Sequence, residues 1–159
     1  MNGTTSDFCA QLATGRVDCW GYGQEGELGD GHSGNSSLPL PAKGLTKVRV
    51  MVAGGIGYCA VLTTGRVSCW GDNSYGELGN GSKHGQSDMP VLVANLTNVT
   101  TVVGDSRGDA TYCSVRSTGQ VYCWGSGAGG YLGNGQFDVN SDVPVAVWAY
   151  NPVAPPVTA

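Results

Sequence analysis

The chain carries little charge and few side chains that titrate near neutral pH. Its 159 residues include 8 Lys and Arg, 12 Asp and Glu, and 2 His, for a formal net charge of −4. The basic residues are scattered singly, so no basic face is available to neutralise phosphates, and we expect no nucleic-acid partner. The two histidines, His32 and His84, lie outside any repeated pattern and near no candidate nucleophile. We therefore predict no catalytic residues, no enzyme activity and no cofactor.

Long apolar runs are also missing. No stretch of 18 apolar residues occurs, so we expect no membrane span. The opening Met-Asn-Gly-Thr-Thr has neither the charged region nor the apolar region of a signal peptide. If the protein is secreted, the expectation is that its signal peptide has already been removed.

Glycine and small polar residues are abundant instead. The chain has 27 Gly, and Ser, Thr, Asn and Asp are spread along its whole length. This composition is typical of short strands joined by tight turns, and it predicts an all-β fold.

An internal repeat organises the chain. Residues 8–21 recur at 58–71 and 112–125, with spacings of 50 and then 54 residues. A Gly-x-Leu-Gly-x-Gly element follows each copy, and a Pro-led apolar strand comes next. The Gly-rich motif spans residues 26–31, 76–81 and 130–135 in the three copies. The Pro-led strand spans 38–41, 89–93 and 143–148. A further apolar strand precedes the second and third copies, at 48–53 and 99–103.

Four short strands in a unit of this length form a β-propeller blade, because one small sheet cannot bury its faces until neighbours stack on it. A solenoid is the alternative, but neither a helical nor a Leu-rich period occurs. We predict three four-stranded propeller-blade repeats within residues 1–150, at about 1–53, 54–107 and 108–150. Residues 151–159 are Pro-rich and predict an extended linker or docking arm.

The motifs Gly-x-Val-x-x-Trp-Gly and Gly-x-Leu-Gly-x-Gly, followed by a Pro-led strand, resemble the regulator-of-chromosome-condensation repeat family over nearly the whole chain. The resemblance implies blades of a propeller that typically has seven. Members of this family include a nucleotide exchange factor for a small GTPase, inhibitors of β-lactamases and uncharacterised bacterial surface proteins. The resemblance thus implies a fold and leaves the function open.

The six cysteines form pairs ten residues apart, and each pair brackets one hairpin. If Ala13-Thr14-Gly15 is a three-residue loop with Gly15 in the left-handed conformation, Cys9 faces Cys19 across the hairpin. The same count applies to the other two copies. We predict the disulfides Cys9–Cys19, Cys59–Cys69 and Cys113–Cys123. Zinc is the competing interpretation, but its ligands usually come as closer pairs such as Cys-x-x-Cys.

Disulfides at this density predict an oxidising compartment, and hence a secreted or extracellular protein. Guanine-nucleotide exchange in a nucleus, one function that the family resemblance implies, is disfavoured because that compartment is reducing and this chain is acidic.

Three further motifs have a functional interpretation beside a structural one. Asp138, Asn140 and Asp142 alternate as calcium ligands do, but the rest of a calcium loop is missing, so an ordinary polar loop is the alternative. Arg107-Gly108-Asp109 resembles an adhesion motif or marks a turn. Trp20, Trp70 and Trp124 recur at one position and are predicted to anchor blade packing.

N-glycosylation sequons occur four times, each as Asn-x-Ser or Asn-x-Thr. Their acceptor residues are Asn2, Asn35, Asn95 and Asn98.

Three blades cannot close a propeller, which typically needs four to eight. The chain is expected to begin with a hairpin that lacks a leading Pro-led strand and to end with a Pro-led strand that lacks its hairpin. We predict that this end strand pairs with the start of another copy, giving a ring or a filament. The predicted assembly residues are Val143, Val145, Val147, Trp148 and Tyr150.

The predicted function is therefore a non-enzymatic extracellular structural protein that binds itself head to tail. The alternative is an extracellular protein- or glycan-binding module from a longer propeller, presenting its inter-strand loops to the partner.

Overall fold

The computed structural model describes residues 2–3, 6–105 and 109–148, which form strands and one short 3-10 helix. The strands, in chain order, are β1 (Asn2–Gly3), β2 (Asp7–Gln11), β3 (Val17–Gly21), β4 (Ser36–Pro41), β5 (Val48–Ala53), β6 (Gly57–Leu62), β7 (Val67–Asp72), β8 (Gln86–Leu92), β9 (Val99–Gly104), β10 (Thr111–Arg116), β11 (Val121–Gly125) and β12 (Ser141–Ala146), and the 3-10 helix η1 spans Ala128–Gly130.

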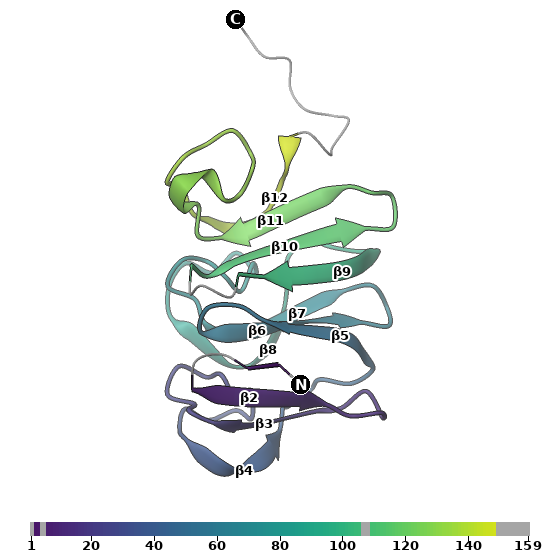
Figure 1. The fold of residues 1–159 in the computed structure, drawn as a ribbon, viewed down its shortest axis with the longest axis vertical. Coiled ribbons are helices and arrows are strands. Elements are labelled where there is room, and N and C mark those ends of the chain that lie inside the picture. Colours follow the sequence, from purple (N-terminus) through teal and green to yellow (C-terminus); the bar gives the residue numbers. More distant parts are fainter. Residues whose placement is uncertain (1, 4–5, 106–108, 149–159) are drawn as a thin grey trace, which may run out of the picture.

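The strands form three four-stranded antiparallel sheets, which confirms the predicted all-β fold of propeller blades. The sheet orders are β1-β2-β3-β4, β5-β6-β7-β8 and β9-β10-β11-β12, each running in sequence order. The sheets lie one above another along the long axis of the molecule, with the long Gly-rich loops at one end of the strands and the short hairpin turns at the other (Figure 1). They do not close on themselves, so the described chain is part of a propeller.

The sheets are offset from the sequence repeats. Residues 48–53 and 99–104 fall inside the predicted first and second units, yet β5 is the first strand of the second sheet and β9 the first strand of the third. The boundaries of the predicted repeats and those of the folded blades therefore differ by one strand. The reason is that β5 and β9 hydrogen-bond to the hairpins that follow them.

The expectation of two complementary half-blades at the ends is wrong. The first hairpin needs no Pro-led strand ahead of it, because the short strand β1 occupies that edge and pairs with β2 through Asn2 and Cys9. The Pro-led strand β12 is not spare either, because it pairs with β11 through Cys123 and Val145. β12 occupies the same outer edge in its sheet that β4 and β8 occupy in theirs.

The three cysteine hairpins have the predicted register. Gly15, Gly65 and Gly119 all have φ near +80°, where glycine is favoured because it lacks a Cβ. The backbone N–H of Leu12 donates to the carbonyl of Arg16, closing the first loop at 2.8 Å. Cysteines therefore lie directly opposite each other, and disulfides join Cys9–Cys19, Cys59–Cys69 and Cys113–Cys123.

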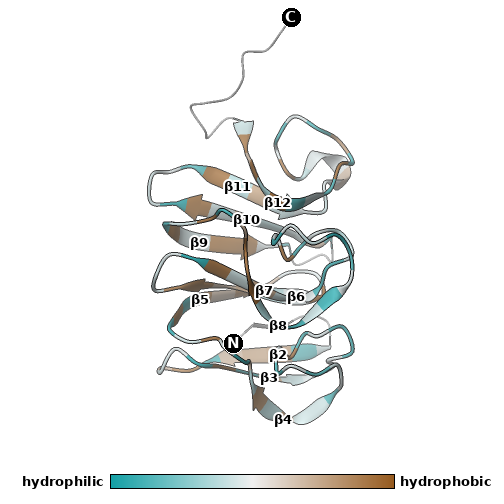
Figure 2. Ribbon diagram, turned by 180° about the vertical axis from the view of Figure 1, so that it is seen from behind, coloured by the Kyte–Doolittle hydropathy of each residue, from teal (hydrophilic) through white to brown (hydrophobic). Residues whose placement is uncertain are grey.

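Two hydrophobic cores hold the sheets together, one at each junction. Successive side chains of a strand point to opposite faces, so the central hairpin of the second sheet contributes to both cores. In the second sheet, Tyr58 and Trp70 point toward the first sheet, while Cys59 and Cys69 point toward the third. Figure 2 shows apolar residues concentrated in the strands and hydrophilic residues in the loops.

Among the described residues, no helix is long and apolar enough to span a bilayer.

Candidate functional site

The junctions between sheets use one repeated tryptophan contact. Trp70 Nε1 donates to the backbone carbonyl oxygen of Glu27 at 2.9 Å, and Trp124 Nε1 donates to that of Glu77 at 2.8 Å. Both indoles are buried. The first two Gly-rich loops each receive the indole of the next sheet, as predicted for Trp70 and Trp124 as packing anchors.

Glycine in the loop is required for this contact. A Cβ at Gly29 would lie 3.0 Å from Trp70 Cδ1, and one at Gly79 would lie 2.7 Å from Trp124 Cδ1. Both glycines also have positive φ, +66° and +61°, which disfavours any other residue. The Gly-x-Leu-Gly motif therefore forms a surface against which an indole ring can pack closely.

The two glutamates also brace the loop through their side chains. Glu27 Oε2 accepts the N–H of Glu25 at 2.8 Å, and Glu77 Oε2 accepts the N–H of Tyr75 at 2.7 Å. Burial raises the pKa of Glu77 to about 7, with the nearby Asp72 carboxylate adding to the effect. Burial also raises the pKa of Glu27. Both junctions therefore contain a buried carboxyl group whose pKa lies above its ordinary value.

A tyrosine provides the second anchor at each junction. The Tyr58 hydroxyl donates to Asp7 Oδ2 at 2.5 Å, and the Tyr112 hydroxyl donates to the carbonyl oxygen of Gly54 at 2.8 Å. Both hydroxyls are buried, and burial raises the pKa of Tyr112 above its ordinary value. Each tyrosine also stacks on the tryptophan of its own sheet, with ring centroids 5.6 and 6.0 Å apart.

The first sheet carries the same aromatic pair without a partner sheet in the described chain. Phe8 and Trp20 stack with ring centroids 6.3 Å apart, at the positions that Tyr58 and Trp70 occupy in the second sheet. Phe8 is 48% exposed and Trp20 is half-buried, whereas their counterparts are buried. We call the surface formed by Phe8 and Trp20 the aromatic face.

The third sheet presents the opposite half of the junction. A cavity of about 320 Å³ lies on it, lined by Val103, Gly104, Asp105 and Tyr131 among others. Val103 is 58% exposed and Tyr131 is 50% exposed. Asp105 corresponds to Gly54, whose carbonyl receives the Tyr112 hydroxyl, and Tyr131 corresponds to Glu77, whose carbonyl receives the Trp124 indole. We call the surface formed by these four residues the receiving face.

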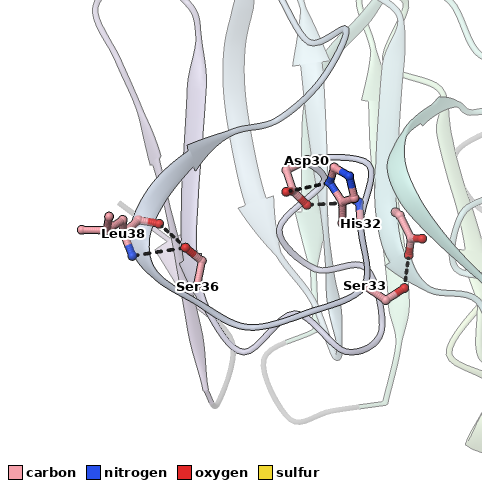
Figure 3. Close-up of polar contacts among 6 residues, drawn as sticks. Asp30, His32, Ser33, Ser36 and Leu38 are labelled. Carbon is pink, nitrogen blue, oxygen red and sulfur yellow. Dashed lines mark hydrogen bonds and ion pairs between the residues drawn. The ribbon is translucent and has the colours of Figure 1, made fainter.

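The long loops carry polar contacts that cross from one sheet to the next. Ser33 Oγ donates to Asp88 Oδ1 at 2.9 Å, and Gln86 Nε2 donates to Ser33 Oγ at the same distance. His32 Nδ1 lies 3.3 Å from Asp30 Oδ2, so the histidine pairs within its own loop (Figure 3). The contacts of Ser33 therefore tie the loop of the first sheet to β8 of the second sheet.

Two of the three predicted calcium residues, Asp138 and Asn140, support turns in the loop before β12. Asp138 Oδ1 accepts the N–H of Gly129 and Asn140 Oδ1 accepts that of Gly127, at 2.9 and 3.0 Å. Within residues 2–3, 6–105 and 109–148, no three His, Cys, Asp or Glu side chains gather closely enough to hold a metal ion. The geometry gives Asp138 and Asn140 a structural role in the loop.

The remaining predicted residues have different placements. Asn95 and Asn98 are exposed in a turn with positive φ, and Asn35 Oδ1 accepts the N–H of Gly23 at 3.1 Å. Asn2 lies in β1, and glycosylation of all four sequons stays a prediction. Arg107, Gly108, Tyr150 and the tail 151–159 lie outside the described residues. Val147 and Trp148 follow β12, and their N–H groups donate to the carbonyls of Val121 and Gly133.

Sequence reasoning missed the receiving face and the role of the two glutamates. The available signal was the recurrence of Gly-Glu-Leu at 26–28 and 76–78, replaced by Gly-Tyr-Leu at 130–132. A buried carboxyl group in two copies and an exposed aromatic ring in the third mark the last loop as different from the other two.

Comparison with known proteins identifies the family of these repeats. The model for the regulator of chromosome condensation (RCC1) repeat matches residues 14–62, 64–107 and 118–155. The E3 ubiquitin-protein ligase HERC2 of Homo sapiens is 37% identical over 137 residues, which cover 82% of this chain and 3% of HERC2, and the protein of Mus musculus is 36% identical over the same length. The matched segment is thus a small part of those relatives.

Solved structures share the fold. Yeast RCC1 (Prp20) bound to Kap60 superposes with a TM-score of 0.79 at 19% identity, and human WBSCR16 with 0.77 at 23%. Each match covers 91% of this chain and 36% of the other. The fold and its sheet junctions therefore define a β-propeller blade protein. The chain belongs to the RCC1 repeat family.

Proposed function

We propose that this chain is a non-enzymatic extracellular interaction module that assembles head to tail, the aromatic face of one copy docking on the receiving face of another. One observation carries the proposal. Two junctions within the chain show which side chains fit each other, and the two outer sheets each present one half of that junction.

In the docked pair, Trp20 takes the position of Trp70 and Trp124. Its Nε1 donates to the backbone carbonyl of Tyr131, and Phe8 enters the cavity beside Asp105. Phe8 lacks the hydroxyl of Tyr58 and Tyr112, so the contact between copies has one hydrogen bond fewer than the internal junctions. Burying a side chain the size of Phe contributes about 1.5–3 kcal/mol, which must offset the loss of rotational and translational freedom. We therefore expect reversible association.

The contact joins different surfaces of the two copies, so it is heterologous. Such a contact closes into a ring if its rotation divides a full turn, and otherwise continues as a filament. We propose that the copies associate by packing the faces of their outer sheets together. This differs from the pairing of strand edges along β12 that the sequence predicted. Strand pairing would leave the exposed aromatic pair of the first sheet uncovered.

An extracellular location is supported by the cysteines. All six are joined in disulfides, and none is left as a free thiol. Such bonds persist in oxidising compartments and are rare in the cytosol and nucleus. Relatives with this fold bind proteins: yeast RCC1 binds Kap60, and Prp20p of Saccharomyces cerevisiae has been studied for binding to Gsp1p and histones. A protein partner is therefore the class we propose for this chain, without those particular partners.

Sedimentation velocity of the oxidised protein between about 1 and 200 µM tests the proposal, because association by mass action depends on concentration. We expect the weight-average mass to rise with concentration, and to stay at the monomer value in Trp20→Ala. The exposed Tyr22→Phe variant is the matched control and should associate like the unmodified chain. A monomer across the whole range contradicts the proposal.

A further inference from the structure

A second cavity lies in the groove between the second and third sheets. Its volume is about 210 Å³, and its lining includes Tyr75, Lys83, His84, Asn140 and Asp142. The first three come from the loop between β7 and β8, and the last two come from the start of β12 and the residue before it. This cavity lies within one chain, so its use is independent of the assembly proposed above.

The equivalent position between the first and second sheets gives a comparison for Asp142. Asp88 and Asp142 occupy the same position, because the carbonyl of Asp88 accepts the N–H of Gly31 at 2.7 Å and that of Asp142 accepts the N–H of Gly81 at 2.8 Å. The Asp88 carboxylate is satisfied within the protein by Ser33 Oγ at 2.9 Å and Gln86 Nε2 at 2.8 Å. One groove is therefore closed by its own side chains.

The second groove lacks these partners. Lys83 stands where the first loop has Ser33, and Asn140 stands where the second sheet has Gln86. Asn140 Oδ1 is already taken by the N–H of Gly127, so its NH₂ group is the part available to a ligand. Within the described part of the chain, no hydrogen bond or ion pair reaches the Asp142 carboxylate. The cavity thus holds an acceptor and a donor that are not paired with each other.

An aromatic ring and two further donors complete the lining. Tyr75 is 49% exposed, although its backbone N–H is fixed by the buried Glu77 carboxyl at 2.7 Å. Lys83 and His84 are exposed at the rim, and His84 has a φ of +69° that holds it at the tip of the turn. Tyr75 therefore presents a ring from a braced backbone beside a set of hydrogen-bonding groups.

We propose that this cavity binds a neutral sugar unit. Vicinal hydroxyl groups match the Asp142 carboxylate as acceptor and the Asn140, Lys83 and His84 nitrogens as donors, while the apolar face of a sugar ring packs on Tyr75. The volume corresponds to about seven water molecules, which suits one ring better than a peptide segment. A simple anion is disfavoured by Asp142 and a cation by Lys83. A protein anchor would require a more apolar pocket.

Titration of the ¹⁵N-labelled chain, followed by ¹H–¹⁵N correlation spectra, tests this site. The probes are D-glucose, D-galactose, D-mannose and N-acetyl-D-glucosamine, with sodium sulfate as the anion control. For at least one sugar we expect saturable shifts confined to residues 74–76, 83–85 and 140–142, with a Kd of about 1–10 mM. Tyr75→Ala and Asp142→Asn should each weaken binding about tenfold.

Two variants separate the site from a general effect. Asp88→Asn changes the corresponding carboxylate of the closed groove and should leave sugar binding unchanged. Tyr75→Phe keeps the ring and should retain binding, which distinguishes stacking from a role of the hydroxyl. No saturable shift with any of the four sugars up to about 100 mM, or shifts that persist in Tyr75→Ala, overturns the proposal. A response to sulfate alone also overturns it and identifies an anion site.

Discussion

Trp124 Nε1 donates a hydrogen bond to the backbone carbonyl oxygen of Glu77, 2.8 Å away across the junction between the second and third sheets. Trp70 and Glu27 repeat the contact one sheet earlier, at 2.9 Å. Two neighbouring sheets can therefore pack in this way when one supplies an indole and the other supplies a loop whose glycine lets the ring approach closely.

Trp70→Ala and Trp124→Ala should each lower the free energy of unfolding by about 3–5 kcal/mol, because each leaves a large cavity and an unpaired carbonyl. Trp20→Ala should cost less than half as much, since Trp20 is half-buried in the single chain. Urea unfolding of dilute protein, monitored by circular dichroism, measures the difference. Equal losses for all three variants would show that the position of the sheet does not matter.

Stability should depend on pH through Glu77. Burial raises its pKa from 4.5 to about 7, so the folded protein holds this proton at pH values where the unfolded chain has lost it. The free energy of unfolding therefore falls as pH rises from 4.5 to 7, by at most about 3 kcal/mol from this group. Glu77→Gln should flatten that decline, leaving the contribution of Glu27, whose pKa is shifted in the same direction. Urea unfolding at pH 5 and pH 8 measures this decline in the free energy of unfolding. A decline in Glu77→Gln as large as that in the unmodified protein would refute the assignment.

The Tyr58 hydroxyl contact with Asp7 should stabilise the first junction. Tyr58→Phe removes a hydrogen-bond donor to the buried Asp7 carboxylate while keeping the ring, so we expect a loss of about 1–3 kcal/mol. Tyr22→Phe, at an exposed position, is the control and should change stability by less than about 0.5 kcal/mol. Thermal unfolding of both variants gives the comparison. Equal melting temperatures for Tyr58→Phe and Tyr22→Phe would show that the hydroxyl contact does not stabilise the junction.

Each disulfide should stabilise its blade by restricting the unfolded chain. Replacing Cys59 and Cys69 together by Ala should lower the free energy of unfolding by about 3 kcal/mol, from the entropy of closing a loop of this length. Dithiothreitol should destabilise the unmodified protein by more than it destabilises the double variant, because the unmodified protein has one more bond to lose. An equal response to the reductant would contradict this role.

The hairpins and their disulfides could be predicted because their geometry is local. The count of residues around Gly15 fixes which cysteine faces which, and the repeat identifies the blade. The sheet boundaries were less accessible, since β5 and β9 join the hairpin after them through hydrogen bonds that the repeat period does not specify. A shift of the repeat by one strand leaves the sequence pattern unchanged.

The junction contacts depend on how one sheet rotates against the next, so they were not predictable from spacing. Asp7 and Tyr58 are 51 residues apart, and nothing in their local sequence pairs them. The same holds for the open groove at Asp142, which is recognised only by comparison with the satisfied Asp88. In a repeat protein the informative positions are those where one copy departs from the others.

Complementation between two variants tests head-to-tail docking most directly. Phe8→Lys places a charge on the aromatic face and Val103→Lys places one on the receiving face, and each variant keeps the other face intact. The account predicts that each variant alone sediments as a monomer, whereas an equimolar mixture forms a one-to-one complex through the two intact faces. A mixture that stays monomeric, or single variants that associate like the unmodified protein, would contradict it.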